Sequence, residues 1–468
     1  MTESATAPPR LLKGLPWVFI GTTGYMLSLA GLTFALPRFL SPLEFGQWQL
    51  FQFYVLYLGY VTFGYSDGLL LRTAGRPWRE LPAPQIRRGL GFLLVAEVVT
   101  FGLLAALLYP VLPKDNWLYL LAAAVGVLFF VPRVVLQFLF QATGRAQAVM
   151  TSMLVERLVL VAAFVVFCFR PSLGLGFLVA ADVVGKVIGL GVSVAMARGL
   201  FQVRPAGWRE GWNAFLEDCR SGMFVVLSNL MALALNGIVR LIIGTALGVV
   251  AFGQVSLALQ VSTVLLVVIN AVSVAVFPNL KSRPTEQWPQ LYLRICRLVL
   301  PLGMAFLLIA EPLGALLRWW SPGYEQAVTL LILLMPVGYF EVKSRGILAV
   351  FMKAVRAERS LFTANFVSAI CGAAACALAA FVLDDLDLAA LSLVLALWVR
   401  TLIVEVITRR RLGLRGMPPV LLEAACLAAY YWMVGPGDVV GYLTFIVLLA
   451  AFWAQLSRQR AHVVPEAA

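Results

Sequence analysis

The sequence predicts an all-α integral membrane protein with about fourteen transmembrane helices, built as two six-helix lobes and an additional C-terminal helix pair. Of its 468 residues, 61% are hydrophobic and only 13% are charged, and the mean hydropathy is +0.91. A soluble protein of this composition would expose large apolar patches to water. The apolar residues also recur in runs of about 20, the length at which a helix crosses the hydrocarbon core of a bilayer.

The predicted spans fall into three groups along the chain. The first group lies near residues 16–39, 48–71, 88–110, 117–140, 147–169 and 174–197. The second lies near 220–246, 251–277, 293–317, 326–350, 361–383 and 388–408. A last, shorter pair lies near 419–434 and 439–456. The expected domains are an N-lobe over 1–197, a cytoplasmic amphipathic linker over 198–219, a C-lobe over 220–408, and the additional helix pair with a cytoplasmic tail over 409–468.

The linker and an internal repeat both support a division into halves. Trp208, Trp212 and Phe215 recur at i, i+4 and i+7, so a helix there would carry an aromatic stripe suited to the membrane interface. The segments 40–50 (LSPLEFGQWQL) and 247–257 (LGVVAFGQVSL) share Leu, Phe, Gly, Gln and Leu in register. Because six helices is an even number, the two lobes would be related by a pseudo-two-fold axis along the membrane normal.

The distribution of basic residues predicts the orientation. If both termini are cytoplasmic, the cytoplasmic segments hold most of the 36 Lys and Arg residues. The outer segments then hold only Arg38, Lys114, Arg170 and Arg318. Cytoplasmic loops carry the excess of basic residues in membrane proteins, so this asymmetry places both termini inside.

Several functional classes are disfavoured by composition. The net charge of +13 comes from Lys and Arg residues scattered between apolar segments, without the basic patch of a nucleic-acid-binding protein. The six cysteines show no CxxC or metal-ligand spacing. The single histidine, His462, lies in the polar tail. The sequence therefore predicts no nucleic-acid partner, no metal and no cofactor.

Charged residues within the predicted spans are the candidate functional residues. A charge at the centre of a membrane helix costs roughly 2.5–3.5 kcal/mol on insertion scales, so it needs a partner or a watered cavity. The basic residues in the spans are Arg133, Arg157, Lys186, Arg240, Lys343, Arg345 and Arg400. The acids there include Glu97, Glu156, Asp182, Glu341 and Glu405.

Two interpretations of these charges are open. Asp182 with Lys186, and Glu341 with Arg345, are spaced i, i+4 and can form ion pairs within one helix. The remaining basic residues have no acid at such spacing and can line a positively charged cavity for an anionic substrate. Lys343 can instead snorkel to the inner surface, and Arg400 can pair with Glu97 or Glu423 from another helix.

A motif resembles a known family. Residues 40–48, LSPLEFGQW, resemble the signature that follows the first helix of polysaccharide flippases, the Wzx-type branch of the multidrug/oligosaccharidyl-lipid/polysaccharide exporter superfamily. Residues 248–254 look like the second copy of that signature, and residues 316–327 resemble the family's outer loop between helices nine and ten. Val239-Arg240 stands where the family often has Asp-Arg, so the arginine carries over and the acid does not.

This resemblance implies a flippase for a polyprenyl-diphosphate-linked oligosaccharide in the inner (cytoplasmic) membrane, with two lobes around a cationic cavity. The basic residues named above would line that cavity, and Asp182 and Glu97 are the candidates for coupling transport to an ion. The implied partners are the lipid-linked substrate, membrane lipids, and the glycosyltransferases and polysaccharide polymerase of the same pathway.

Two alternatives remain. A multidrug or metabolite exporter of the same superfamily predicts a cavity dominated by acids, because its substrates are cationic. A membrane polysaccharide polymerase or glycosyltransferase needs a sizeable loop that carries acid and base groups. The expected outer loops are only a few residues long, and their one acidic cluster is Asp384, Asp385 and Asp387.

Overall fold

The computed structural model describes Gly24, Ser28 and residues 31–263, 284–355, 357–414, 419–435 and 439–459. These residues form helices and turns, with no strand among them, which confirms the predicted all-α class. Within this described part, ten helices are long and apolar enough to cross a membrane. The chain divides into two compact units, Met1–Leu230 and Met231–Ala468.

Some sequence-based expectations concern residues that lie outside this description. They include most of the predicted span 16–39, the second half of the span 251–277, and the tail with His462.

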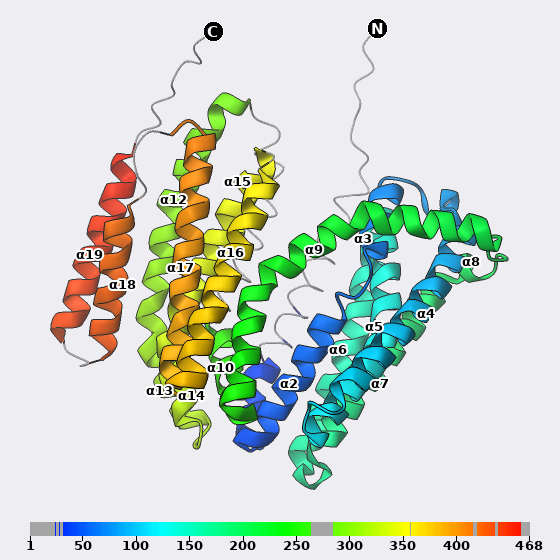
Figure 1. The fold of residues 1–468 in the computed structure, drawn as a ribbon, viewed down its shortest axis with the longest axis horizontal. Coiled ribbons are helices and arrows are strands. Elements are labelled where there is room, and N and C mark those ends of the chain that lie inside the picture. Colours follow the sequence, from blue (N-terminus) through cyan, green and yellow to red (C-terminus); the bar gives the residue numbers. More distant parts are fainter. Residues whose placement is uncertain are drawn as a thin grey trace. The chain divides into compact units, whose positions relative to one another are not determined.

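The first unit is a bundle of helices around one central helix, α5. Its elements are α2 (Pro42–Leu58), α3 (Tyr65–Thr73), η1 (Trp78–Glu80), α4 (Ala83–Leu108), α5 (Lys114–Ala142), α6 (Ala146–Phe169), η2 (Pro171–Leu173), α7 (Gly174–Met196), α8 (Arg198–Phe201) and the first part of α9 (Trp208–Ala246) (Figure 1). Helix α5 packs against α2, α3, α4, α6 and α7. Val127, Val131 and Val135 are fully buried and recur every four residues, so they supply the core-facing stripe of this helix.

The second unit is organised around α14. Its elements are the rest of α9, α10 (Gly248–Ser262), η3 (Thr285–Gln287), α12 (Trp288–Ala305), η4 (Phe306–Ile309), α13 (Ala310–Trp320), α14 (Glu325–Glu341), η5 (Val342–Leu348), α15 (Ala349–Ala354), α16 (Glu358–Ala377), η6 (Leu378–Val382), α17 (Leu386–Arg411), α18 (Val420–Val434) and α19 (Val439–Arg458) (Figure 1). Helix α14 packs against α10, α12, α13, α17 and α18. It continues into η5, a π-helical stretch, and such stretches often occur at functional sites.

The family-like segment 40–48 is a helix start. The backbone N–H of Ser41 donates to Glu44 Oε2 at 2.9 Å, and the N–H of Glu44 donates to Ser41 Oγ at 3.3 Å. This reciprocal capping satisfies two N–H groups that the first turn of α2 leaves without helical partners. Pro42 occupies the first turn, where its fixed φ favours helix initiation.

The predicted span 48–71 is wrong as a single helix, because the structure divides it into α2 and α3. Helix α2 ends at Leu58, and Phe63 and Gly64, directly before α3, adopt left-handed backbone conformations with φ of 52° and 80°. Hydropathy does not reveal this break because the apolar residues of α2 and the leucine run 69–71 of α3 are counted in one span.

Next to the break, α3 and the first part of α9 make a backbone-to-backbone contact. A Cβ atom at Gly68 would lie 1.8 Å from the carbonyl oxygen of Asp218, and one at Gly222 would lie 2.0 Å from the carbonyl oxygen of Gly64. Only glycine allows this approach. An ion pair closes the contact, with Arg72 Nη2 2.7 Å from Asp218 Oδ2.

Replacing Gly68 with alanine is expected to destabilise the protein by about 3 kcal/mol, because the added methyl group must push the two backbones apart. Thermal unfolding in detergent would measure the loss. Gly91→Ala in α4 is the matched control, since nothing lies within 4 Å of its would-be Cβ. Equal melting temperatures for both variants would contradict the packing described here.

The predicted linker does not end where the next span was expected to begin. Helix α9 runs without interruption from Trp208 to Ala246, so residues 208–219 and the predicted span 220–246 form one helix. No proline interrupts the sequence between them. Phe92 of α4 receives the predicted aromatic stripe, with ring centroids 4.9 Å from Trp208, 5.2 Å from Trp212 and 5.9 Å from Phe215. Part of the stripe therefore packs on protein.

Candidate functional site

A cavity of about 370 Å³ opens in the first unit. It has the size of a small-molecule site, for which about 300–1,000 Å³ is typical. Residues of α2, α3, α5, α6, α7 and α9 line it, and its apolar wall includes Phe130 and Phe138. Its charged lining consists of Asp67, Glu156, Arg157 and Lys186.

A buried ion network lies at the wall of this cavity. Arg133 Nη2 is 2.6 Å from Glu156 Oε2, and Lys186 Nζ is 3.9 Å from Glu156 Oε1. Lys186 also pairs with Asp182, one turn earlier on α7. All four side chains are buried, and they come from α5, α6 and α7. Two cations and two carboxylates therefore neutralise one another across three helices.

Glycines let these three helices approach closely enough for the network to form. A Cβ atom at Gly185 would lie 2.9 Å from the carbonyl oxygen of Glu156, and one at Gly189 would lie 3.2 Å from Arg133 Cδ. On α5, a Cβ at Gly126 would lie 3.3 Å from Lys186 Cδ. Larger residues would separate the helices and lengthen the ion pairs.

The lining charges of the cavity balance. Among the described residues, the two cations Arg157 and Lys186 and the two carboxylates Asp67 and Glu156 line the cavity. The cationic cavity expected from the sequence therefore stays a prediction.

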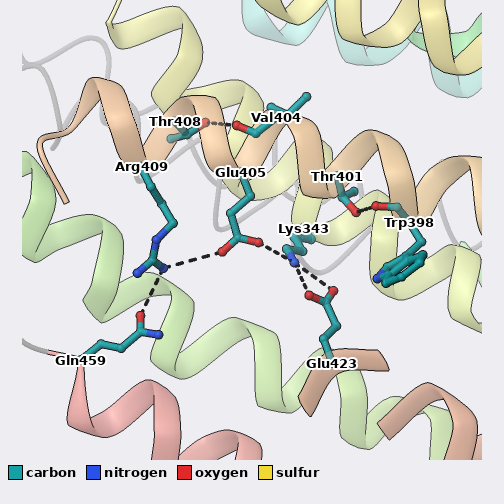
Figure 2. Close-up of polar contacts among 9 residues, drawn as sticks. All are labelled: Lys343, Trp398, Thr401, Val404, Glu405, Thr408, Arg409, Glu423 and Gln459. Atoms are coloured by element: carbon teal, nitrogen blue, oxygen red, sulfur yellow. Dashed lines mark hydrogen bonds and ion pairs between the residues drawn. The ribbon is translucent and has the colours of Figure 1, made fainter. Parts of the chain in front are cut away.

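A second buried network lies in the second unit. Lys343 Nζ is 2.7 Å from Glu405 Oε2 and 2.6 Å from Glu423 Oε2. Arg409 Nη1 is 3.8 Å from Glu405 Oε1 and donates a hydrogen bond of 3.2 Å to Gln459 Oε1. Figure 2 shows Lys343 between the two carboxylates, with Arg409 beyond Glu405. Since Glu423 belongs to α18, this network fixes the C-terminal helix pair to η5 and α17.

A third network centres on Glu341. Its carboxylate pairs with Arg345, lies 3.5 Å from Arg400 Nη2 and accepts a hydrogen bond of 3.1 Å from Asn236. Arg240, one turn along α9, donates to the carbonyl oxygen of Asn236 at 3.1 Å. The structure thus brings the cations of η5 and α17, and the side-chain amide of Asn236 on α9, to one carboxylate.

These networks show which ion pairs the individual intramembrane charges form. The i, i+4 pairs of Asp182 with Lys186 and of Glu341 with Arg345 are both present. Lys343 does not snorkel, because two buried carboxylates hold it. Arg400 pairs with Glu341 rather than with Glu97 or Glu423.

The predicted site residues are therefore divided among separate places. Of these residues, only Arg157 and Lys186 line the cavity. Arg133 pairs with Glu156, and Asp182 pairs with Lys186. The other predicted cations, Arg240, Lys343, Arg345 and Arg400, belong to the second unit. Glu97 is fully buried on α4, and neither carboxylate oxygen has a hydrogen-bond partner among the described residues.

Sequence reasoning missed two carboxylates of the cavity wall as site residues. Asp67 falls inside the predicted span 48–71, so the rule that singles out charges within spans could have found it. Glu156 was visible as an acid within a span, but its role depends on Arg133 and Lys186, which come from other helices.

In both halves of the chain, the fourth and the sixth predicted spans carry charged residues. In the first half these are the fourth and sixth spans, with Arg133 on α5 and Lys186 on α7. In the second half they are again the fourth and sixth, with Lys343 on η5 and Glu405 on α17.

The sequence matches one protein family, and the fold is similar to those of several solved structures. Residues 11–282, more than half of the chain, match a protein family described as polysaccharide biosynthesis protein. No protein of curated function matches the sequence.

Three solved structures have similar folds. The lipid II flippase MurJ, in an inward closed conformation, is 9% identical with a TM-score of 0.64, over 96% of this chain and 100% of that chain. An inward-facing multidrug resistance MATE family transporter of the MOP superfamily is 15% identical with a TM-score of 0.62, over 85% and 94%. A MOP superfamily transporter from Pyrococcus furiosus, described as having a binding pocket of reverse polarity, is 15% identical with a TM-score of 0.56, over 88% and 99%. At such identities the likeness shows the fold alone.

Proposed function

The chain belongs to the polysaccharide biosynthesis protein family, and on that premise we propose that it is a flippase for a polyprenyl-diphosphate-linked oligosaccharide. It is a multi-pass membrane protein, and its fold is similar to those of the MATE family transporter and the MurJ flippase. In this proposal it resides in the cytoplasmic membrane with both termini in the cytoplasm. It moves the substrate from the inner to the outer leaflet by alternating access of the lobes 1–197 and 220–408, and it performs no chemical step on the substrate.

The observation that carries this proposal is the pair of cations on the cavity wall. Arg157 and Lys186 lie on α6 and α7, helices long and apolar enough to cross the membrane, and both side chains line the cavity. Guanidinium and ammonium groups bind phosphate through charge-assisted hydrogen bonds, and arginine does so bidentately. The cavity volume suits a diphosphate and the sugar next to it, and the polyprenyl chain would remain in the lipid.

A second candidate function is export of a cationic drug or metabolite. The observation that favours it is the presence of Asp67 and Glu156 in the same lining. Glu156 is already engaged by Arg133, whereas the described hydrogen bond of Asp67 is a contact of 3.3 Å with its neighbour Ser66. Asp67 is therefore the acid through which this cavity would hold a cation.

Deletion of the gene is expected to leave the lipid-linked oligosaccharide on the inner leaflet while its synthesis continues. The measurement is the accessibility of the glycan to a glycosidase added outside intact or spheroplasted cells. A large polar head group crosses the bilayer negligibly without a transporter, so background crossing should be low. In this scheme glycosyltransferases supply the substrate and a polymerase consumes it.

Each competing function gives a different result in this assay. A polymerase deletion would still deliver single repeat units to the outer surface. An exporter deletion would leave the glycan unchanged and raise sensitivity to cationic toxic compounds. Equal amounts of outer-leaflet glycan in wild-type and deletion cells, in a strain without a second flippase, would exclude the proposed function.

A further inference from the structure

Glu156 has an unexpected position for a carboxylate in a phosphate-binding cavity. It lines the cavity, yet its two oxygens are directed to Arg133 and Lys186, the kind of cations that a diphosphate would seek. Arg133 Nη2 approaches one oxygen to 2.6 Å, and Lys186 Nζ lies 3.9 Å from the other. A carboxylate and a phosphoryl group offer the same type of anionic oxygen to such donors.

The charge balance of the network explains why this carboxylate is needed when the cavity is empty. Glu156 pairs with both Arg133 and Lys186, so its loss would remove one of the two carboxylates that Asp182 and Glu156 bring to these buried cations. An uncompensated charge is costly within a membrane-spanning bundle. Glu156 removes that cost in the absence of substrate.

The contacts of Glu156 also show how it can be displaced. The 3.9 Å separation from Lys186 is longer than a hydrogen bond, so this half of the interaction is a loose ion pair. Lys186 keeps Asp182 as a partner when Glu156 moves. Because Glu156 lines the cavity, the space next to its side chain is open to the carboxylate. The backbone of α6 need not move, and Gly185 packs against the carbonyl oxygen of Glu156 to hold it.

We infer that Glu156 is an internal counter-anion that determines the specificity of the cavity. In the empty state its carboxylate, which also pairs with Arg133, occupies the place beside Lys186 that a phosphoryl group of the substrate takes. A ligand must then supply enough negative charge to replace a carboxylate that is already in position. Diphosphate carries more negative charge than orthophosphate and therefore replaces the carboxylate more readily. This inference rests on the proposed function, because it assigns a role within the same substrate cavity.

The test is binding of inorganic diphosphate to the purified protein in detergent, measured by titration calorimetry. Glu156→Gln removes the competing charge and is expected to bind diphosphate about tenfold more tightly than the wild type. It should also gain measurable binding of orthophosphate and so discriminate less between the two anions. Glu156→Asp keeps the charge on a shorter side chain and should have intermediate affinity, which provides an independent test if Glu156→Gln folds poorly.

The matched control is Asp115→Asn, which also removes one negative charge from the first unit. Asp115 lies at the exposed start of α5, the helix that carries Arg133, and it does not line the cavity. The affinity of the Asp115→Asn variant for diphosphate should equal that of the wild type. An equal gain in this variant would show that net charge alone is responsible and would overturn the assignment.

Failure of the inference can be distinguished from failure of the proposed function. If the wild type binds diphosphate, Arg157→Ala weakens that binding, and both Glu156 variants bind no more tightly than the wild type, the counter-anion role is wrong and the substrate cavity stands. If neither the wild type nor Glu156→Gln binds diphosphate, the cavity is not the headgroup site, and the proposed function loses the observation that carries it.

Discussion

Lys343→Met is expected to lower the free energy of unfolding by about 3–5 kcal/mol, the largest effect of any single substitution considered. The lysine holds Glu405 and Glu423 at 2.7 and 2.6 Å, and all three side chains are buried. Its removal leaves two carboxylates with Arg409 alone, at 3.8 Å from Glu405. Chemical or thermal unfolding of the protein in detergent would measure the loss.

A double variant separates the effect of charge from the effect of side-chain shape. Lys343→Met combined with Glu423→Gln leaves Glu405 facing Arg409, so the cluster is neutral again and most of the lost stability should return. Glu423→Gln alone should be less harmful than Lys343→Met, because one carboxylate still faces the lysine. Wild-type stability of Lys343→Met would show that the network contributes little.

Arg157→Ala is expected to reduce transport about 100-fold while the protein is made and inserted normally. The side chain lines the cavity, and two charge-assisted hydrogen bonds to a phosphate contribute about 3 kcal/mol together, which corresponds to a factor of roughly 100. Arg157→Lys should recover only part of the activity, because an ammonium group cannot bind bidentately. Outer-leaflet glycan in the complemented deletion strain, normalised to protein level, is the measurement.

Arg170→Ala provides the control for that experiment. Arg170 lies just beyond the C-terminal end of α6, is exposed and does not line the cavity. Its replacement therefore removes a basic charge without changing the site. Its transport should match the wild type. Full activity of Arg157→Ala in the same assay would remove Arg157 from the list of substrate-binding residues.

The sequence predicts those helices well that are determined by the length of one apolar run. Helices α4 to α7 begin and end within a few residues of the predicted spans, because about 20 apolar residues in a row satisfy the bilayer only as a helix. The break between α2 and α3 was not predictable in this way. At this place Gly68 and Gly222 contact backbone atoms far away in the sequence, and such contacts leave no periodic signal.

The candidate site shows the same division. Spacing along one helix is sufficient to predict the pair of Asp182 with Lys186. The contacts of Arg133 with Glu156 and of Arg400 with Glu341 join different helices, and no spacing rule covers them. As a result, the cations and the acids could be named from the sequence, but the pairs that join different helices could not.

The glycine contact between α3 and α9 has a mechanical consequence. Ordinary helix interfaces interdigitate side chains, which can change rotamers and absorb a small shift. Between Gly68 and Asp218 the backbones meet directly, so this junction has no such play. Asp67, next to Gly68, lies in the wall of the cavity. A displacement of α9 at Asp218 would therefore also move α3 and reposition Asp67 in the cavity wall.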